Sequence, residues 1–143
     1  MKSLFSVAGK TVLITGGSRG IGAMLAEGFV RSGATVFISA RKAGELEDCR
    51  ARLAKLGDCR SLIADLSTTA GVQALVDAVA QHTDTLDVLI NNAGASWGAP
   101  LDQFPESGWD KVMNLNLKSL FFLSQQLLPL LRRAARPEAY ASI

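Results

Sequence analysis

A run of glycines follows an apolar stretch near the start of the chain, in a pattern that suits a diphosphate. The stretch Thr11–Thr15 is rich in β-formers and leads directly into the glycine-rich turn 16–22. Apolar residues at helical spacing, Ile21, Leu25 and Phe29, follow at once. The start of a helix leaves backbone N–H groups unpaired and carries partial positive charge, so it attracts anions, and glycines let a diphosphate come close. The strand, turn and helix therefore predict a dinucleotide pyrophosphate site.

Basic residues lie where such a site would hold a ribose phosphate. The second strand-like run ends in Ser39-Ala40-Arg41-Lys42, and this segment contains no Asp or Glu that would bind a ribose 2′-hydroxyl and repel a 2′-phosphate. Arg19, inside the glycine-rich turn, is a third cation that could face the same phosphate. A solvated basic loop is the alternative interpretation, but the position after a strand favours a ligand. We therefore predict NADP(H) rather than NAD(H), with Arg19 and Arg41 near the phosphate.

Polar residues follow two more strand-like runs. Asp65 and Leu66 come after the third run, and Asn91 to Gly94 come after the fourth. Ligands of open parallel sheets bind beyond the carboxyl ends of the strands, which favours a binding role for both groups. Two alternatives without a ligand stay open. Asp65 could serve simply as a cap of the next helix, near Ser67, and the two asparagines could be turn residues.

Asn116 stands out in the middle of the last helical pattern. Asn is a poor helix former, and an inward-facing amide needs hydrogen-bond partners. Asn114, two residues earlier, should point elsewhere, towards solvent. Of the two tryptophans, Trp97 could line the substrate side, whereas Trp109 is expected to pack at the start of a helix.

Four apolar runs and four helical patterns alternate along the chain and must position these residues. The expected strands are Thr11–Thr15, Thr35–Ser39, Arg60–Ala64 and Asp87–Asn91. The expected helices are 20–32, 45–56, 69–82 and a long one over 107–133. Because each run is apolar at consecutive positions, it fits a parallel sheet covered on both faces. The order predicts an α/β fold, a Rossmann-type doubly wound parallel sheet that stops after about four βα units, with no second domain.

Local signals set the limits of these helices. Helix 45–56 should bury one face, made of Leu46, Cys49, Leu53 and Leu56. Ser67 or Thr68 is expected to cap helix 69–82. Pro129 should kink or end the last helix, because proline lacks the N–H that a helix interior needs.

The spacing Thr15-Gly16-x-x-x-Gly20-x-Gly22 resembles that of the short-chain dehydrogenase/reductase family, and further motifs match in the family's order. They are Asp65-Leu66, Asn91-Asn92-Ala93-Gly94 and Asn116, so the resemblance covers the chain from Val7 onward. Within the family, the residues Ser96-Trp97-Gly98, Gly108-Trp109 and 125–133 are similar to those of 3-oxoacyl-[acyl-carrier-protein] reductases of the rhamnolipid type.

The resemblance implies an NADPH-dependent oxidoreductase that reduces a carbonyl to an alcohol, with a 3-oxoacyl thioester as one candidate substrate. It assigns cofactor binding to Gly16, Ser18, Arg19, Gly20, Ile21, Gly22, Arg41, Asp65, Leu66, Asn92, Ala93 and Gly94. In the family, Asp65 lies against the adenine, one asparagine ties neighbouring strands, and Ala93 and Gly94 let the nicotinamide ribose approach.

The resemblance also implies a role for the last helix. Asn116 belongs to the catalytic set, where it holds a water near the active-site lysine and distorts the helix locally. The family forms a subunit interface through this helix, which would account for Phe121 and Phe122, so a homo-oligomer is expected.

The family's catalytic Ser and Tyr-x-x-x-Lys are not recognised in these 143 residues. Tyr140 is the single tyrosine, and its partner lysine would be residue 144. A fifth strand should begin at Ala141, so neither Tyr140 nor Ser142 is expected to be catalytic, and the fourth strand should be an open edge. We expect residues 1–143 to be the N-terminal NADP(H)-binding part of such a domain. The alternative is a catalytically inactive NADP(H)-binding fragment or a truncated gene product.

Composition and charge argue against several other classes. With 48% hydrophobic and 20% charged residues and a formal net charge of +2, the chain resembles an ordinary globular protein without a nucleic-acid or membrane partner. No run approaches the roughly 20 apolar residues of a membrane span. Cys49 and Cys59 form no CxxC pair, and the lone His82 lies at no ligand spacing. Free thiols, no metal site and a cytoplasmic location are therefore expected.

Overall fold

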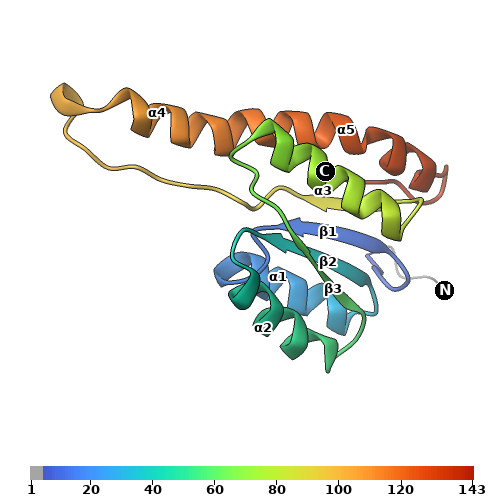
Figure 1. Ribbon diagram of the computed structural model, residues 1–143. Helices are drawn as coiled ribbons and strands as arrows, with labels where there is room; N and C mark the ends of the chain where they lie inside the picture. Colours follow the sequence, from blue (N-terminus) through green and yellow to red (C-terminus); the bar gives the residue numbers. More distant parts are fainter. Residues whose placement is uncertain (1–4) are drawn as a thin grey trace.

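A four-stranded parallel sheet forms the centre of the protein in a computed structural model that describes residues 5–143 (Figure 1). Its strands are β1 (Thr11–Thr15), β2 (Thr35–Ala40), β3 (Cys59–Ile63) and β4 (Val88–Ile90). The strand order is β3-β2-β1-β4, so the chain passes from one side of β1 to the other between β3 and β4. Where the order reverses, the connections beyond β1 and β4 diverge and leave a crevice at their carboxyl ends.

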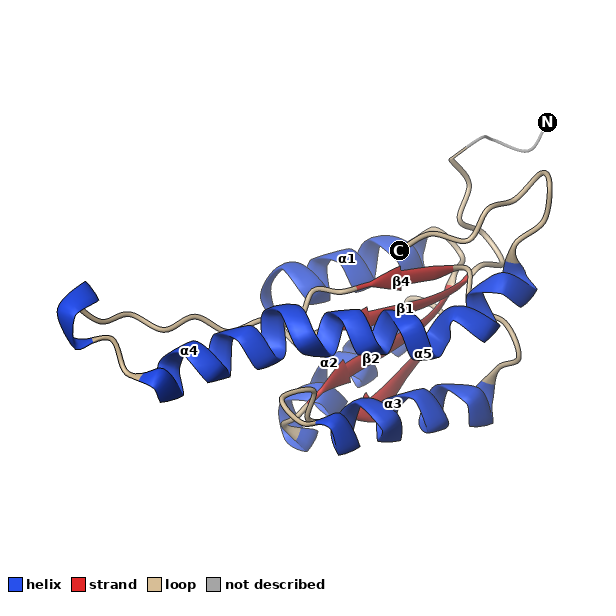
Figure 2. Cartoon of the chain, turned by 90° about the horizontal axis from the view of Figure 1, so that it is seen from above, coloured by secondary structure: helices blue, strands red, loops and turns tan. Residues whose placement is uncertain are grey.

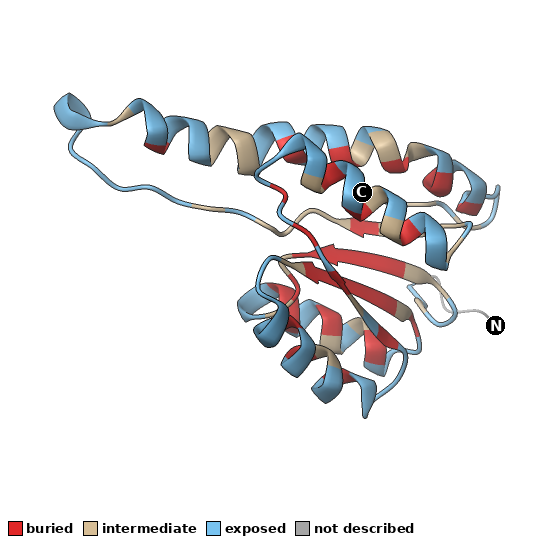
Figure 3. Cartoon of the chain, viewed as in Figure 1, coloured by how far each residue is buried: buried red, intermediate tan, exposed pale blue. Residues whose placement is uncertain are grey.

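Helices cover both faces of this sheet, as Figure 1 and Figure 2 show. One face carries α1 (Gly20–Arg31) and α2 (Ala43–Ala54), and the other carries α3 (Thr69–His82) and α5 (Ser119–Ala134). Alternate residues of each strand point to opposite faces, and this separates two cores. Val12 and Ile14 pack with α1 and α2, whereas Leu13 packs with α3 and α5. Figure 3 shows the buried residues in the strands and on the inward helix faces. The predicted doubly wound α/β fold is confirmed.

The long helix expected over 107–133 consists of three segments. They are α4 (Glu106–Met113), a π-helical turn (Asn114–Lys118) and α5, preceded by a short 3-10 turn (Leu101–Gln103). Pro129, which was predicted to kink or end the last helix, does not end it, since α5 continues to Ala134. Pro129 is exposed, whereas Leu127 and Leu130 beside it are buried, and their burial holds the helix together. None of the helices within residues 5–143 is both long and apolar enough to cross a membrane.

Several elements begin or end at other residues than expected. Helix α2 begins at Ala43 and ends before Leu56, whose side chain is exposed, so the inward position predicted for Leu56 is wrong. Strand β3 begins at Cys59 rather than Arg60, which buries Cys59 in the same core as Cys49. Both cysteines are free thiols, and burial raises the pKa of Cys59 to about 11.

The edge of β4 is partly paired by the end of the chain. Ser142 forms a parallel bridge with Val88, in which the Leu89 N–H donates to the Ser142 carbonyl at 2.9 Å and the Ser142 N–H donates to the Asp87 carbonyl at 2.8 Å. The expected start of a fifth strand near Ala141 therefore lies beside β4. The open edge predicted for β4 is open only beyond this bridge.

The Thr68 side chain caps α3 and gives a test of local stability. Its Oγ1 accepts a hydrogen bond from the Gly71 N–H at 3.0 Å, which decides between the two expected caps. Thr68→Ala will lower the free energy of unfolding by about 1 kcal/mol, because one backbone donor of the first turn loses its partner. Urea denaturation followed by circular dichroism measures the loss. The neighbouring Thr69→Ala, which removes a hydroxyl that forms no cap, is the matched control, and an equal loss in both variants would contradict this role of Thr68.

Candidate functional site

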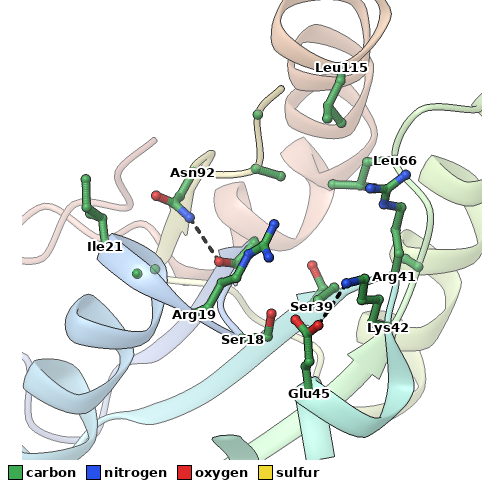
Figure 4. Close-up of a pocket in the computed structure, with 17 residues that line it drawn as sticks. Ser18, Arg19, Ile21, Ser39, Arg41, Lys42, Glu45, Leu66, Asn92 and Leu115 are labelled. Atoms are coloured by element: carbon green, nitrogen blue, oxygen red, sulfur yellow. Dashed lines mark hydrogen bonds and ion pairs between the residues drawn. The ribbon is translucent and has the colours of Figure 1, made fainter. Parts of the chain in front are cut away.

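A pocket of about 350 Å³ opens at the carboxyl ends of the strands, beside the switch between β1 and β4 (Figure 4). It contains most of the residues predicted to bind a cofactor, namely Gly16, Ser18, Arg19, Gly20, Ile21, Gly22, Arg41, Leu66, Asn92, Ala93 and Gly94. Two predicted site residues, Asp65 and Asn116, do not line it. Ser39, Ala40 and Lys42, from the basic segment that the sequence placed near a ribose phosphate, also line it. Sequence reasoning missed three further lining residues, Glu45, Ala64 and Leu115.

The glycines of the turn after β1 are required by its backbone. Gly16 and Gly20 have positive φ angles, +65° and +54°, which L side chains rarely adopt. Gly22 leaves no room for a Cβ, which would overlap the Gly16 carbonyl oxygen and lie 2.6 Å from Asn92 Nδ2. Arg19 precedes α1 without a side-chain cap, so the first N–H groups of α1 stay available to an anion.

Asn92 ties the turn after β1 to the end of β4. Its Nδ2 donates hydrogen bonds to the carbonyls of Thr15 at 2.9 Å and Gly16 at 3.1 Å. The Thr15 hydroxyl accepts from the N–H groups of Asn92 and Ala93, each at 3.0 Å. Asn91 instead donates to Ser124 Oγ on α5 at 3.1 Å. Of the two asparagines, Asn92 thus makes the strand-to-strand tie, and its amide is already engaged.

Basic side chains gather at the β2 end of the pocket. Figure 4 shows Arg19 reaching in from the glycine turn and Arg41 from the end of β2. Neither arginine forms an ion pair with any residue of 5–143. Lys42, in contrast, pairs with Glu45, with 2.9 Å between Nζ and Oε1. The segment 39–42 contains no carboxylate, as its sequence shows, but the first turn of α2 adds Glu45 to the pocket. The (i, i+3) spacing between Lys42 and Glu45 is the sequence pattern that could have predicted this pair.

Asp65 lies beside the pocket rather than in its lining. Its Oδ1 accepts hydrogen bonds from the Ser67 N–H at 3.0 Å and from the Ser67 hydroxyl at 2.7 Å. These bonds lower the pKa of the Asp65 carboxyl. Its neighbours Ala64 and Leu66 supply the lining. Asp65 thus forms a turn with Ser67, whereas the cap of α3, a role that the sequence left open for Asp65, is Thr68. Contact of Asp65 with an adenine stays a prediction.

Asn116 lies in the π-helical turn and holds the segment that follows β4. Its Oδ1 accepts from the Ala95 N–H and its Nδ2 donates to the Ala95 carbonyl, both at 2.8 Å. The expected local distortion of the helix is present, and a π turn is common at functional sites. Asn116 is exposed and Asn114 is half-buried, so the burial expected for these two residues is reversed. Leu115 between them points into the pocket (Figure 4).

The two tryptophans share a second hollow, between the segment after β4 and α4. Trp97 lies against Gly108, where an added Cβ would come within 2.7 Å of the indole ring. Lys111 Nζ lies 5.3 Å from the centre of the same ring. Trp109 is largely exposed and lines this hollow with Trp97, so the prediction that it packs at the helix start is wrong.

Several known proteins are similar to this chain in sequence. Residues 10–138 match the family model described as short chain dehydrogenase. The rhamnolipids biosynthesis 3-oxoacyl-[acyl-carrier-protein] reductase of Pseudomonas aeruginosa is 52% identical over 143 residues, which are 100% of this chain and 56% of that protein. Gluconate 5-dehydrogenase of Gluconobacter oxydans is 37% identical over 85% of this chain and 48% of its own length.

Solved structures give the same result. The Pseudomonas aeruginosa RhlG/NADP active-site complex has a TM-score of 0.94 and 52% identity, and it covers 99% of this chain and 55% of that one. L-sorbose reductase of Gluconobacter frateurii, complexed with NADPH and L-sorbose, has a TM-score of 0.86 and 27% identity over 92% of this chain and 51% of that one. The chain thus spans about half the length of these relatives.

Proposed function

The chain belongs to the short-chain dehydrogenase family, and from that premise we propose that residues 1–143 are the N-terminal NADP(H)-binding part of a carbonyl reductase. The observation that carries the proposal is the pair of arginines, Arg19 and Arg41, in the pocket without ion-pair partners among residues 5–143. Relatives solved as NADP or NADPH complexes support the choice of coenzyme.

In this proposal each part of the pocket has a separate task. The glycine turn and the first N–H groups of α1 hold the diphosphate, and Arg19 and Arg41 hold the 2′-phosphate. Leu66 and Asp65 flank the adenine, and Ala93 and Gly94 leave room for the nicotinamide ribose. Asn116 positions the segment at Ala95 beside the reacting groups, the part we assign to it in catalysis. The coenzyme, when bound, supplies the hydride.

Coenzyme titration tests this function. We expect the 143-residue chain to bind NADPH at least tenfold more tightly than NADH, because a charge-assisted hydrogen bond contributes about 1.5–3 kcal/mol. Isothermal titration calorimetry at fixed ionic strength measures both dissociation constants. Equal affinities, or tighter binding of NADH, would sink the assignment.

For the substrate we propose a 3-oxoacyl thioester. The 52% identical relative carries a 3-oxoacyl-[acyl-carrier-protein] reductase name, which supports a 3-oxoacyl thioester as substrate. We expect a chimaera, in which residues 1–143 are followed by the remaining part of that relative, to reduce a 3-oxoacyl thioester with NADPH. Absorbance at 340 nm follows the reaction, with L-sorbose as the comparison substrate. A folded chimaera that binds NADPH yet reduces neither substrate would favour a catalytically inactive NADP(H)-binding protein.

We also infer a homo-oligomer formed through α5. Leu117, Leu120 and Phe121 lie at helical spacing on one exposed strip, with Leu117 57% and Phe121 58% exposed. Burying such side chains against a second copy is favourable by about 1.5–3 kcal/mol each. Two free thiols further support a reducing compartment, which we propose is the cytoplasm.

Replacing Phe121 tests the interface. Phe121→Glu will shift the chain towards monomer in sedimentation velocity, because a charge replaces the most exposed apolar side chain of the strip. Met24→Glu is the control, since Met24 is also an exposed apolar side chain but lies on α1. An unchanged sedimentation coefficient in Phe121→Glu would remove α5 as the interface.

A further inference from the structure

A carboxylate stands among the cations at the β2 end of the pocket, and the proposed function leaves it without a role. Glu45, in the first turn of α2, lines the pocket with Lys42, and Figure 4 shows the pair joined by an ion pair below Arg19 and Arg41. The first turn of a helix favours a carboxylate, and the (i, i+3) spacing favours its pairing with Lys42. Local helix structure therefore holds Glu45 in place.

Glu45 is negatively charged at neutral pH. The hydrogen bond from Lys42 lowers the pKa of the Glu45 carboxyl, and the positive charges of Lys42 and Arg19 lower it further. Arg19 belongs to the glycine-rich turn, so the charge of Glu45 interacts with the cation that this turn contributes to the pocket. Lys42 is committed to this carboxylate, whereas Arg19 and Arg41 have no ion-pair partner in the described part of the chain.

We propose that Glu45 is a specificity-determining residue that weakens the binding of coenzymes carrying a 2′-phosphate. The proposal rests on the proposed function, in which this pocket takes NADP(H). A phosphate monoester carries about −1.5 to −2 charges at pH 7, so a nearby carboxylate repels it, whereas an uncharged 2′-hydroxyl is not repelled. Glu45 also pairs with Lys42, so the Lys42 ammonium is less available to the 2′-phosphate. Both effects weaken binding of the 2′-phosphate, so removing the carboxylate charge strengthens chiefly the binding of the form that carries this phosphate.

The experiment uses two fragments of the coenzymes, adenosine 2′,5′-bisphosphate and 5′-AMP, which differ only in the 2′-phosphate. Glu45→Gln keeps the length and the hydrogen-bonding capacity of the side chain and removes its charge. We expect it to tighten binding of the bisphosphate by about fivefold, the size of one exposed ion-pair contribution, and to leave 5′-AMP within about twofold. Glu47→Gln is the matched control, because Glu47 lies on the same helix but pairs with Arg50 away from the pocket.

Calorimetric titrations at pH 7.5 and low salt give the four affinities, and circular dichroism verifies that both variants are folded. Unchanged or weaker binding of the bisphosphate by Glu45→Gln would overturn the proposal. Equal tightening of both ligands would also overturn it, since the 2′-phosphate would then be irrelevant. The proposed function has a separate readout: wild-type protein that prefers 5′-AMP contradicts NADP(H) binding, while selective tightening in Glu45→Gln would still support the role of Glu45.

Discussion

Arg41→Ala will weaken NADPH binding by roughly ten- to a hundredfold and leave NADH binding within about twofold. Arg41 lies in the pocket at the end of β2 and has no ion pair among residues 5–143, so its guanidinium is available to a phosphate. A charge-assisted hydrogen bond of about 1.5–3 kcal/mol corresponds to that loss, and NADH lacks the phosphate that would make it.

Calorimetry with both coenzymes measures the effect, and two variants serve as controls. Arg50→Ala removes an arginine from the same region but outside the pocket, where it pairs with Glu47, and should change neither affinity. Arg41→Lys should restore part of the NADPH affinity, because an ammonium keeps the charge but loses the bidentate geometry. A parallel loss of NADH affinity in Arg41→Ala would mean that Arg41 supports the pocket rather than reads the phosphate.

Gly22→Ala will lower the free energy of unfolding by about 1–3 kcal/mol and abolish coenzyme binding. The added methyl would overlap the Gly16 carbonyl oxygen and crowd Asn92 Nδ2, so the turn and the tie to β4 must both move. The N–H groups that hold the diphosphate move with them.

Gly28→Ala provides the control for this variant within the same helix. A Cβ at Gly28 meets nothing within 4 Å, so the substitution should raise the free energy of unfolding by about 0.5–1 kcal/mol through helix propensity. Urea denaturation compares the two variants with the wild type. If Gly22→Ala unfolds at the wild-type midpoint, the close packing at Gly22 is not a constraint.

The sequence was most informative where the chemistry is local. The glycine-rich turn between β1 and α1, and the alternation of strands and helices, depend on residues close together in the chain, and both were predicted correctly. Arg41 was placed at the pocket for the same reason, because it directly follows β2. Glu45 was missed because only the turn of α2 carries it into the pocket. Leu115 was missed because the π turn rotates the helix, and hydrophobic spacing assumes a regular helix.

At Pro129 and Trp109, too, contacts between distant residues outweigh the local sequence pattern. Packing on both sides of Pro129 overrides a local signal that usually ends a helix. Trp109 lines a hollow with Trp97 because the segment after β4 folds back against α4, a contact between residues that no short motif encodes.

The division of the sheet into two cores has a consequence for the evolution of this protein. Neighbouring residues of a strand such as β1 pack into different cores. Val12 and Ile14 pack against α1 and α2, whereas Leu13 packs against α3 and α5. Substitutions in well-separated contacts act almost independently, so either layer can drift in sequence while the other keeps its packing. The glycine turn and Arg41 adjoin the layer of α1 and α2, whereas Asn116 and the exposed strip of the last helix adjoin the layer of α3 and α5, so the two groups of residues can change in sequence with little effect on one another.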